Sequence, residues 1–146
     1  MKILLLADNW VGWKVTKHLK SLGEDIVGLF VHPPEHQHYT NEIVEASELD
    51  SKKIFIGEKE WSEKQLTKVE ELSPDLVLVV FWTFLLPNRF IDIPPNGCIN
   101  FHLSYLPYNR GKKPNVWPII DGTPGGVTMH YIDNDIDSGR IIAQSE

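Results

Sequence analysis

Two polar side chains in one short apolar segment could act together on a carbonyl group. Asn100 and His102 stand two residues apart in the segment 98–103, whose composition is typical of a β-strand. Because strand side chains alternate between faces, the amide and the imidazole project from the same face, about 6–7 Å apart along the backbone. The amide can donate to a developing oxyanion and the imidazole can take a proton. Asp137, 35 residues after His102, could orient that imidazole. Three residues alone do not exclude the simpler interpretation that Asn100 and His102 are a partly buried polar pair at a strand end.

The residues that follow His102 favour the catalytic interpretation. The run from Asn100 to Gly111 reads Asn-Phe-His-Leu-Ser-Tyr-Leu-Pro-Tyr-Asn-Arg-Gly. It resembles the signature of the folate-dependent formyltransferase family, in which Asn-x-His-x-Ser-Leu-Leu-Pro commonly leads into Arg-Gly. Further matches occur in the family's order at Leu85-Leu86-Pro87, Pro114, Trp117, 126–130 and 132–139. The resemblance runs from about Met1 to Gln144 and is strongest from Asp75 onward.

This resemblance implies an enzyme that transfers a formyl group from N10-formyltetrahydrofolate to a primary amine. It implies that Asn100 stabilises the tetrahedral oxyanion, that His102 acts as general base or relays protons to the leaving N10, and that Asp137 holds His102. It calls for no metal. It also implies a pterin pocket lined by the loop before Leu-Pro and by the acidic loop, here Trp82, Phe84, Leu85, Leu86, Ile132, Asp133 and Asp135. The sequence departs from the family at 81–84, where smaller residues often stand, and at Asp135, where many relatives carry glycine.

The charge of the chain and its aromatic residues indicate which kind of amine accepts the formyl group. The net charge of −6 disfavours a large polyanion such as tRNA as a partner. A small cationic group beside His102 suits a phosphate, and nearby rings could stack on a base or sugar. We expect Trp10, Tyr105, Tyr108, Arg110 and Lys112 to bind the substrate. The segments 104–111 and 8–13 are most similar to members that formylate nucleotide-linked amino sugars. Methionyl-tRNA formyltransferase, glycinamide ribonucleotide transformylase and a non-catalytic folate-binding fragment are the alternatives.

Other chemistries find less support. The first turn, Asp8-Asn9-Trp10-Val11-Gly12, lacks the Gly-x-Gly-x-x-Gly of dinucleotide-binding folds. His32, His36 and His38 lie close together in the sequence, but no nearby cysteine and no further histidine at a suitable spacing completes a zinc site. Cys98 lies about 13 Å along the strand from His102, too far for a nucleophile–base pair, and is expected in the core. His130 is expected to be a satisfied structural histidine.

Composition and length describe one ordinary globular domain. The 146 residues are 42% hydrophobic and 23% charged, and no apolar run approaches the ~20 residues of a membrane helix. A single cysteine excludes an intramolecular disulfide and fits a reducing compartment. We therefore expect a cytoplasmic protein with small-molecule substrates and no membrane partner.

Alternating strand and helix patterns predict an α/β fold, an open, mostly parallel twisted sheet with flanking helices, Rossmann-like in arrangement. The predicted strands are 2–7, 25–32, 53–56, 75–81, 98–103, 127–133 and 140–144. The predicted helices are 11–21, 42–49, 60–72 and 114–121, with a turn or short helix at 87–91. We expect residues 1–146 to form a catalytic domain, truncated or minimal at its C-terminus. Its uncovered sheet edge predicts a homodimer, or lower stability than a longer version would have.

Overall fold

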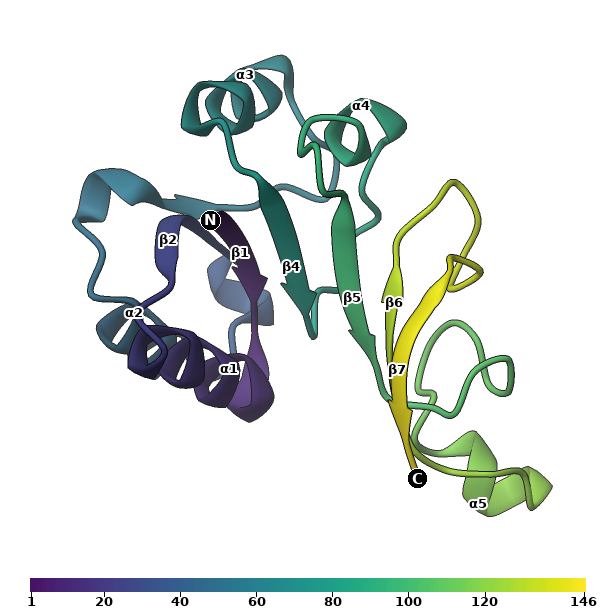
Figure 1. The fold of residues 1–146 in the computed structure, drawn as a ribbon. Helices are drawn as coiled ribbons and strands as arrows, with labels where there is room; N and C mark the ends of the chain where they lie inside the picture. Colours follow the sequence, from purple (N-terminus) through teal and green to yellow (C-terminus); the bar gives the residue numbers. More distant parts are fainter. The chain divides into compact units, whose positions relative to one another are not determined.

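The computed structural model describes residues 1–146, which group into two compact units, Met1–Gly97 and Cys98–Glu146. Figure 1 shows the strands and helices of both units. The first unit is a parallel sheet in the order β3-β2-β1-β4 with helices on both faces. Its strands are β1 (Lys2–Ala7), β2 (Asp25–Val31), β3 (Ile54–Ile56) and β4 (Leu76–Val80). Helices α1 (Asn9–Ser21) and α2 (Thr40–Ser47) lie on one face, and α3 (Glu63–Leu72) and α4 (Asn88–Ile91) on the other.

The core of the first unit follows from its continuous apolar strands. Strands β1, β2 and β4 are buried along nearly their whole length, as expected of parallel strands covered on both faces. Short 3-10 turns, Pro34–His36 and Ser51–Lys53, precede α2 and β3. Three chain segments emerge at the carboxyl ends of β1, β2 and β4, beginning at Asp8, His32 and Phe81.

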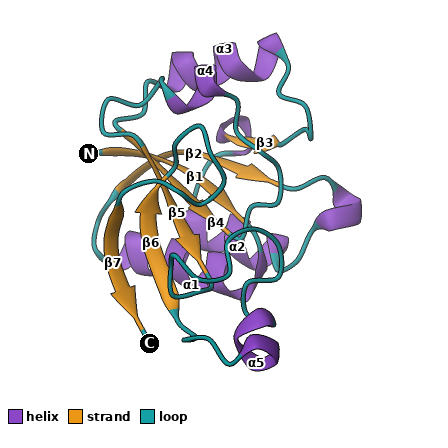
Figure 2. Cartoon of the chain, turned by 90° about the vertical axis from the view of Figure 1, so that its right-hand side faces the viewer, coloured by secondary structure: helices purple, strands orange, loops and turns teal.

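The second unit is an antiparallel sheet of β5 (Cys98–His102), β6 (Val127–Tyr131) and β7 (Ile141–Ser145), with the short helix α5 (Trp117–Asp121) (Figure 2). A buried hydroxyl supports the loop after β5. Thr128 Oγ1 donates to the carbonyl of Ser104 at 2.7 Å and accepts the amide N–H of Leu106 at 3.1 Å. The close approach of Gly139 to β6 fixes the β6–β7 connection, since a Cβ at that position would lie 1.7 Å from the carbonyl oxygen of Tyr131.

The predicted α/β class, with a mostly parallel sheet and flanking helices, is confirmed. Element boundaries differ by a few residues. Helix α3 begins after Ser62, whose hydroxyl accepts the amide N–H of Gln65, and α5 begins at Trp117 rather than 114. Cys98 is fully buried, as expected of a core cysteine. No helix has the length and apolar character needed to cross a bilayer. The single catalytic domain expected over residues 1–146 stays a prediction.

Candidate active site

A carboxylate connects the polar side chains of the second unit. Asp137 Oδ2 lies 3.5 Å from Nδ1 of His102 and accepts the amide N–H of Gly111 at 2.9 Å. Its other oxygen, Oδ1, lies 3.5 Å from both Nδ2 of Asn100 and Nε2 of His130. Strands β5 and β6 and the loop before β7 therefore bring Asn100, His102 and Asp137 together. The spacing of these three residues in the sequence predicted that they would meet, and His130 joins them from β6.

The ring of His102 faces oxygen acceptors on both sides. Nε2 lies 3.0 Å from the backbone carbonyl oxygen of Asn109, which can only accept, so Nε2 carries a proton. Nδ1 faces the carboxylate of Asp137. A proton on Nδ1 would let the ring donate to the carboxylate as well. In this conformation the contact with the Asn109 carbonyl leaves Nε2 no free lone pair with which to take a proton.

His130 has the opposite arrangement. Its Nδ1 lies 2.8 Å from the carbonyl oxygen of Tyr131 and donates to it. Its Nε2 lies 3.3 Å from the side-chain nitrogen of Asn100 and 3.5 Å from Oδ1 of Asp137, so it can accept from the amide or, when it carries a proton, donate to the carboxylate. The antiparallel register pairs Asn100 directly with His130, which is why the two side chains meet. His130 is buried and both of its ring nitrogens have partners, as expected of a satisfied structural histidine, whereas its contact with Asn100 depends on a β5–β6 register that is not readable from either strand alone.

The environment keeps Asp137 ionised. Burial would raise the pKa of its carboxyl, but the hydrogen bond from His130, the amide of Gly111 and the nearby ring of His102 outweigh burial. The pKa of Asp137 is therefore held below its ordinary value. An anion between two imidazoles and an amide can orient a donor and balance a positive charge, which is what attack on a formyl carbon requires.

The formyl transferase family model matches residues 9–146 of this sequence. The chain belongs to the formyl transferase family. A methionyl-tRNA formyltransferase from Thermodesulfovibrio yellowstonii is 34% identical over 137 residues, which is 89% of this chain and 44% of that protein. The chain spans less than half the length of curated relatives such as this one.

Solved structures of family members share the fold. A Mycobacterium tuberculosis protein suggested to be a sugar N-formyltransferase is 30% identical, with a TM-score of 0.72 over 99% of this chain and 53% of that chain. A phosphoribosylglycinamide formyltransferase from Anaplasma phagocytophilum has a TM-score of 0.81 over 99% of this chain and 70% of that chain, at 21% identity. The second likeness concerns the fold alone.

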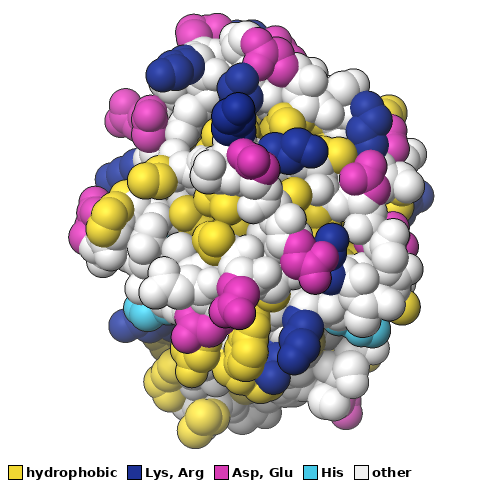
Figure 3. Space-filling view, turned by 90° about the vertical axis from the view of Figure 1, so that its left-hand side faces the viewer, with side chains coloured by type: hydrophobic (Ala, Val, Ile, Leu, Met, Phe, Trp, Pro, Cys, Tyr) yellow, Lys and Arg dark blue, Asp and Glu magenta, His cyan; other side chains and the backbone are white.

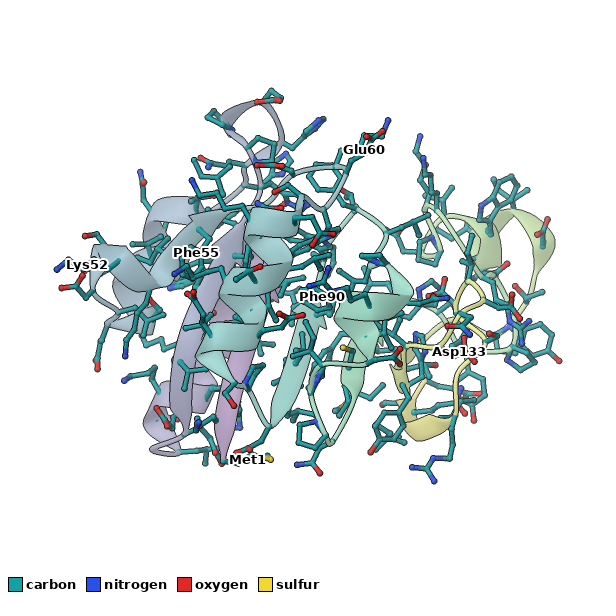
Figure 4. The ribbon with its side chains drawn as sticks, turned by 90° about the horizontal axis from the view of Figure 1, so that it is seen from above. Met1, Lys52, Phe55, Glu60, Phe90 and Asp133 are labelled. Carbon is teal, nitrogen blue, oxygen red and sulfur yellow. The ribbon has the colours of Figure 1, made fainter.

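The residues expected to bind folate are divided between the two units. In the second unit, Asp133 lies in the loop between β6 and β7 (Figure 4) and stabilises this loop by hydrogen bonds. Its Oδ1 accepts the Ser138 hydroxyl at 2.6 Å and the Asp135 amide at 3.1 Å. Ile132 precedes this loop, and its amide N–H donates to the carbonyl of Cys98 at 2.8 Å. The first unit carries Trp82, Phe84, Leu85 and Leu86, of which Leu85 is the most exposed.

The residues expected to bind the acceptor are largely exposed. Arg110, Lys112 and Tyr108 present their side chains to solvent next to the segment that carries Gly111, and Tyr105 is half-buried. Trp10 belongs to the first unit, where it is also exposed and lies 5.4 Å from the ammonium of Lys14. No three His, Cys, Asp or Glu side chains are arranged to hold a metal ion. Nδ1 of His38 lies 3.0 Å from Oδ2 of Asp8.

Proposed function

We propose that this chain transfers a formyl group from N10-formyltetrahydrofolate to a primary amine. The observation that carries the proposal is the carboxylate of Asp137, which reaches both the imidazole of His102 and the amide of Asn100 at 3.5 Å. An oxyanion donor, a proton carrier and an orienting carboxylate are the groups that acyl transfer to an amine needs. Membership of the formyl transferase family supports the same donor.

Each of the three side chains has a separate role in the proposed reaction. As the amine nitrogen bonds to the formyl carbon, the amide of Asn100 donates to the oxygen that gains negative charge. His102 gives a proton to N10 as the bond between N10 and the formyl carbon breaks, and it receives the proton that the amine loses. Asp137 balances the positive charge of His102 while the ring is an imidazolium. Because the carbonyl of Asn109 holds Nε2 of His102, the substrates must replace that contact before proton transfer.

Substitution of the three residues tests this assignment. Asn100→Ala, His102→Ala and Asp137→Ala should each lower formyl transfer by roughly 10²- to 10⁴-fold, the usual contribution of such groups, while the protein stays folded. Matched controls are His18→Ala and Asp121→Ala, which change exposed residues of the same types. Near-normal turnover in all three site variants, with an acceptor that the wild-type protein formylates, would refute the mechanism.

The donor site is testable separately by binding. We propose that the segment from Trp82 to Leu86 and the loop from Ile132 to Asp135 contact the folate. A reduced folate such as 5-formyltetrahydrofolate should then quench tryptophan fluorescence, and Trp82→Ala should diminish the signal. Failure to bind at millimolar ligand would remove the cofactor assignment. Binding without turnover on any acceptor would instead support the non-catalytic folate-binding alternative.

For the acceptor we propose a nucleotide-linked amino sugar. The exposed side chains of Arg110 and Lys112 suit a diphosphate, and the net charge of −6 opposes a large polyanion. On the face shown in Figure 3, basic and acidic side chains are interspersed, which is not the continuous basic surface typical of RNA binding. The likeness to the 30% identical Mycobacterium tuberculosis protein supports the same choice. Arg110→Ala should weaken acceptor use more than folate binding.

Methionyl-tRNA is the second candidate acceptor, because curated relatives over most of this chain are methionyl-tRNA formyltransferases. A direct comparison separates the two. The protein should be assayed with charged initiator tRNA and with a panel of nucleotide-linked amino sugars under one donor concentration. Efficient formylation of the tRNA, with the sugars ignored, would replace our choice.

A further inference from the structure

A second group of polar side chains lies in the first unit, where the chain leaves β1, β2 and β4. Asp8 follows β1 and is 4% exposed, and His32 follows β2 and is 0% exposed. Thr83, in the segment after β4, hydrogen-bonds to the ring of His32. A buried histidine beside a buried carboxylate is unusual enough to require a role, and the proposed formyl transfer does not use either residue.

The hydrogen bonds assign the proton of His32 to one nitrogen. The backbone amide of Thr83 lies 3.2 Å from Nε2, and an amide N–H can only donate. Nε2 must therefore offer its lone pair, which also lies 3.0 Å from the Thr83 hydroxyl. The ring proton is then on Nδ1. That nitrogen faces Oδ2 of Asp8 at 3.6 Å and has no hydrogen-bond partner.

Asp8 is held in its charged form. Burial would raise its pKa, but the neighbouring ring of His32 and the backbone and side-chain hydrogen bonds from His38 outweigh burial, so the pKa lies below its ordinary value. His38 donates its backbone N–H to Oδ1 at 2.8 Å, and its Nδ1 lies 3.0 Å from Oδ2. The carboxylate thus favours a proton on Nδ1 of His32 and leaves Nε2 to Thr83.

The segment that begins at Phe81 is strained and closely packed against His32. Phe81 has a φ of 58°, a left-handed conformation that a bulky residue rarely adopts. The ring of Trp82 stacks on that of His32, with centroids 4.1 Å apart and an interplanar angle of 10°. Trp82 also lies against Gly57, where a Cβ would come within 2.4 Å of the indole. Phe84 packs edge-on against the His32 ring, with the ring centroids 5.0 Å apart.

We propose that neutral His32, set in one tautomer by Asp8, positions the segment 81–86 for the folate donor and releases Thr83 from that position when it is protonated. This inference rests on the proposed function, which places Trp82–Leu86 at the donor site. His32 acts through Trp82 and Thr83 and is a positioning residue. Asp8 serves as its fixed counter-charge.

Protonation of His32 would change its contact with Thr83. A second proton on Nε2 would set an N–H against the amide N–H of Thr83, so the Thr83 peptide must turn away. The same proton strengthens the contact of Nδ1 with Asp8 and the stacking on Trp82, because an imidazolium is attracted to a carboxylate and to an indole face. The other titratable neighbours are His38, which contacts Asp8, and His36, whose ring lies 5.9 Å from that of Phe84. The segment after β4 contributes no charged group to these contacts.

Nuclear magnetic resonance tests the protonation step in the unmodified protein. At high pH, long-range ¹H–¹⁵N spectra should show the Nδ1–H tautomer for His32. On acidification, the Thr83 amide resonance should move together with that of the His32 ring. An Nε2–H tautomer, or a Thr83 amide that stays fixed while His32 titrates, would overturn the proposal.

The link to the donor is tested by affinity for 5-formyltetrahydrofolate against pH. In the wild-type protein, affinity should fall by up to about tenfold for each pH unit below the midpoint, the slope of one linked proton. His32→Gln supplies an uncharged acceptor and should remove this slope, whereas His18→Gln should keep it. The same slope in His32→Gln and the wild-type protein would overturn the positioning role. No folate binding at any pH would instead refute the proposed function, and the resonance of Thr83 would still decide whether His32 controls the segment.

Discussion

Replacing Asp137 by Asn tests the candidate active site most directly, because it removes the charge and keeps the size. The structure allows its cost to be worked out. The 2.9 Å bond from the Gly111 amide to Oδ2 would change from a charge-assisted bond, worth about 1.5–3 kcal/mol, to a neutral one worth about 0.5–1.5 kcal/mol. The contacts with His102 and His130, both at 3.5 Å, add a smaller amount. We expect a loss of about 1–2 kcal/mol at pH 7, or roughly 3–8 °C in the melting temperature.

The lowered pKa of Asp137 determines how the stability difference between the wild-type protein and Asp137→Asn varies with pH. The folded-state pKa of Asp137 is below its ordinary value, so its ionised form stabilises the fold above the unfolded pKa of about 3.9. That stability is lost as the pH falls through the folded pKa. The difference between the wild-type protein and Asp137→Asn should therefore be constant from about pH 7 to 5 and shrink below about pH 4.

Urea unfolding at several pH values measures this difference, with Asp121→Asn as the control at an exposed aspartate. The control should match the wild-type protein at every pH. In the same preparations, formyl transfer should fall by roughly 10²- to 10⁴-fold in Asp137→Asn only. A variant as stable as the wild-type protein at pH 7, or a difference that grows on acidification, would refute the assignment of Asp137 as the anion that holds the cluster.

Three further outcomes follow from the second unit. Gly139→Ala should destabilise the fold by at least about 3 kcal/mol in denaturant unfolding, because its Cβ would meet the carbonyl of Tyr131; an unchanged midpoint would contradict the close approach. His130→Ala should lower kcat with little change in KM, because the acceptor that orients the Asn100 amide is lost; a change confined to KM would argue against this role. The exposed apolar start of β7, which pairs with β6 alone among the strands of its unit, predicts a homodimer in light scattering that Ile142→Lys disrupts; a stable monomer would contradict it.

The sequence predicted the parts of the site that depend on local periodicity. Asn100 and His102 alternate along one strand, so their shared face follows from spacing alone. The contact of Asn100 with His130 depends on the antiparallel register of β5 and β6, which no local pattern encodes. The orientation of the His102 ring depends on Asn109, a residue in left-handed conformation with φ of 58°. Such a turn is set by the loop as a whole, so the capping of Nε2 by a carbonyl could not be predicted.

The two histidines beside Asp137 have different roles because their remaining partners differ. His130 lies between the backbone carbonyl of Tyr131, the side-chain amide of Asn100 and, at 3.5 Å, the carboxylate of Asp137. His102 lies between the carbonyl of Asn109 and the same carboxylate. A group that must carry a proton between amine and N10 has to exist in both states during turnover. Replacement of the Asn109 carbonyl by a substrate changes what Nε2 of His102 faces, whereas His130 keeps its partners. We therefore propose His102 as the proton carrier and His130 as the residue that orients the Asn100 amide toward the oxyanion.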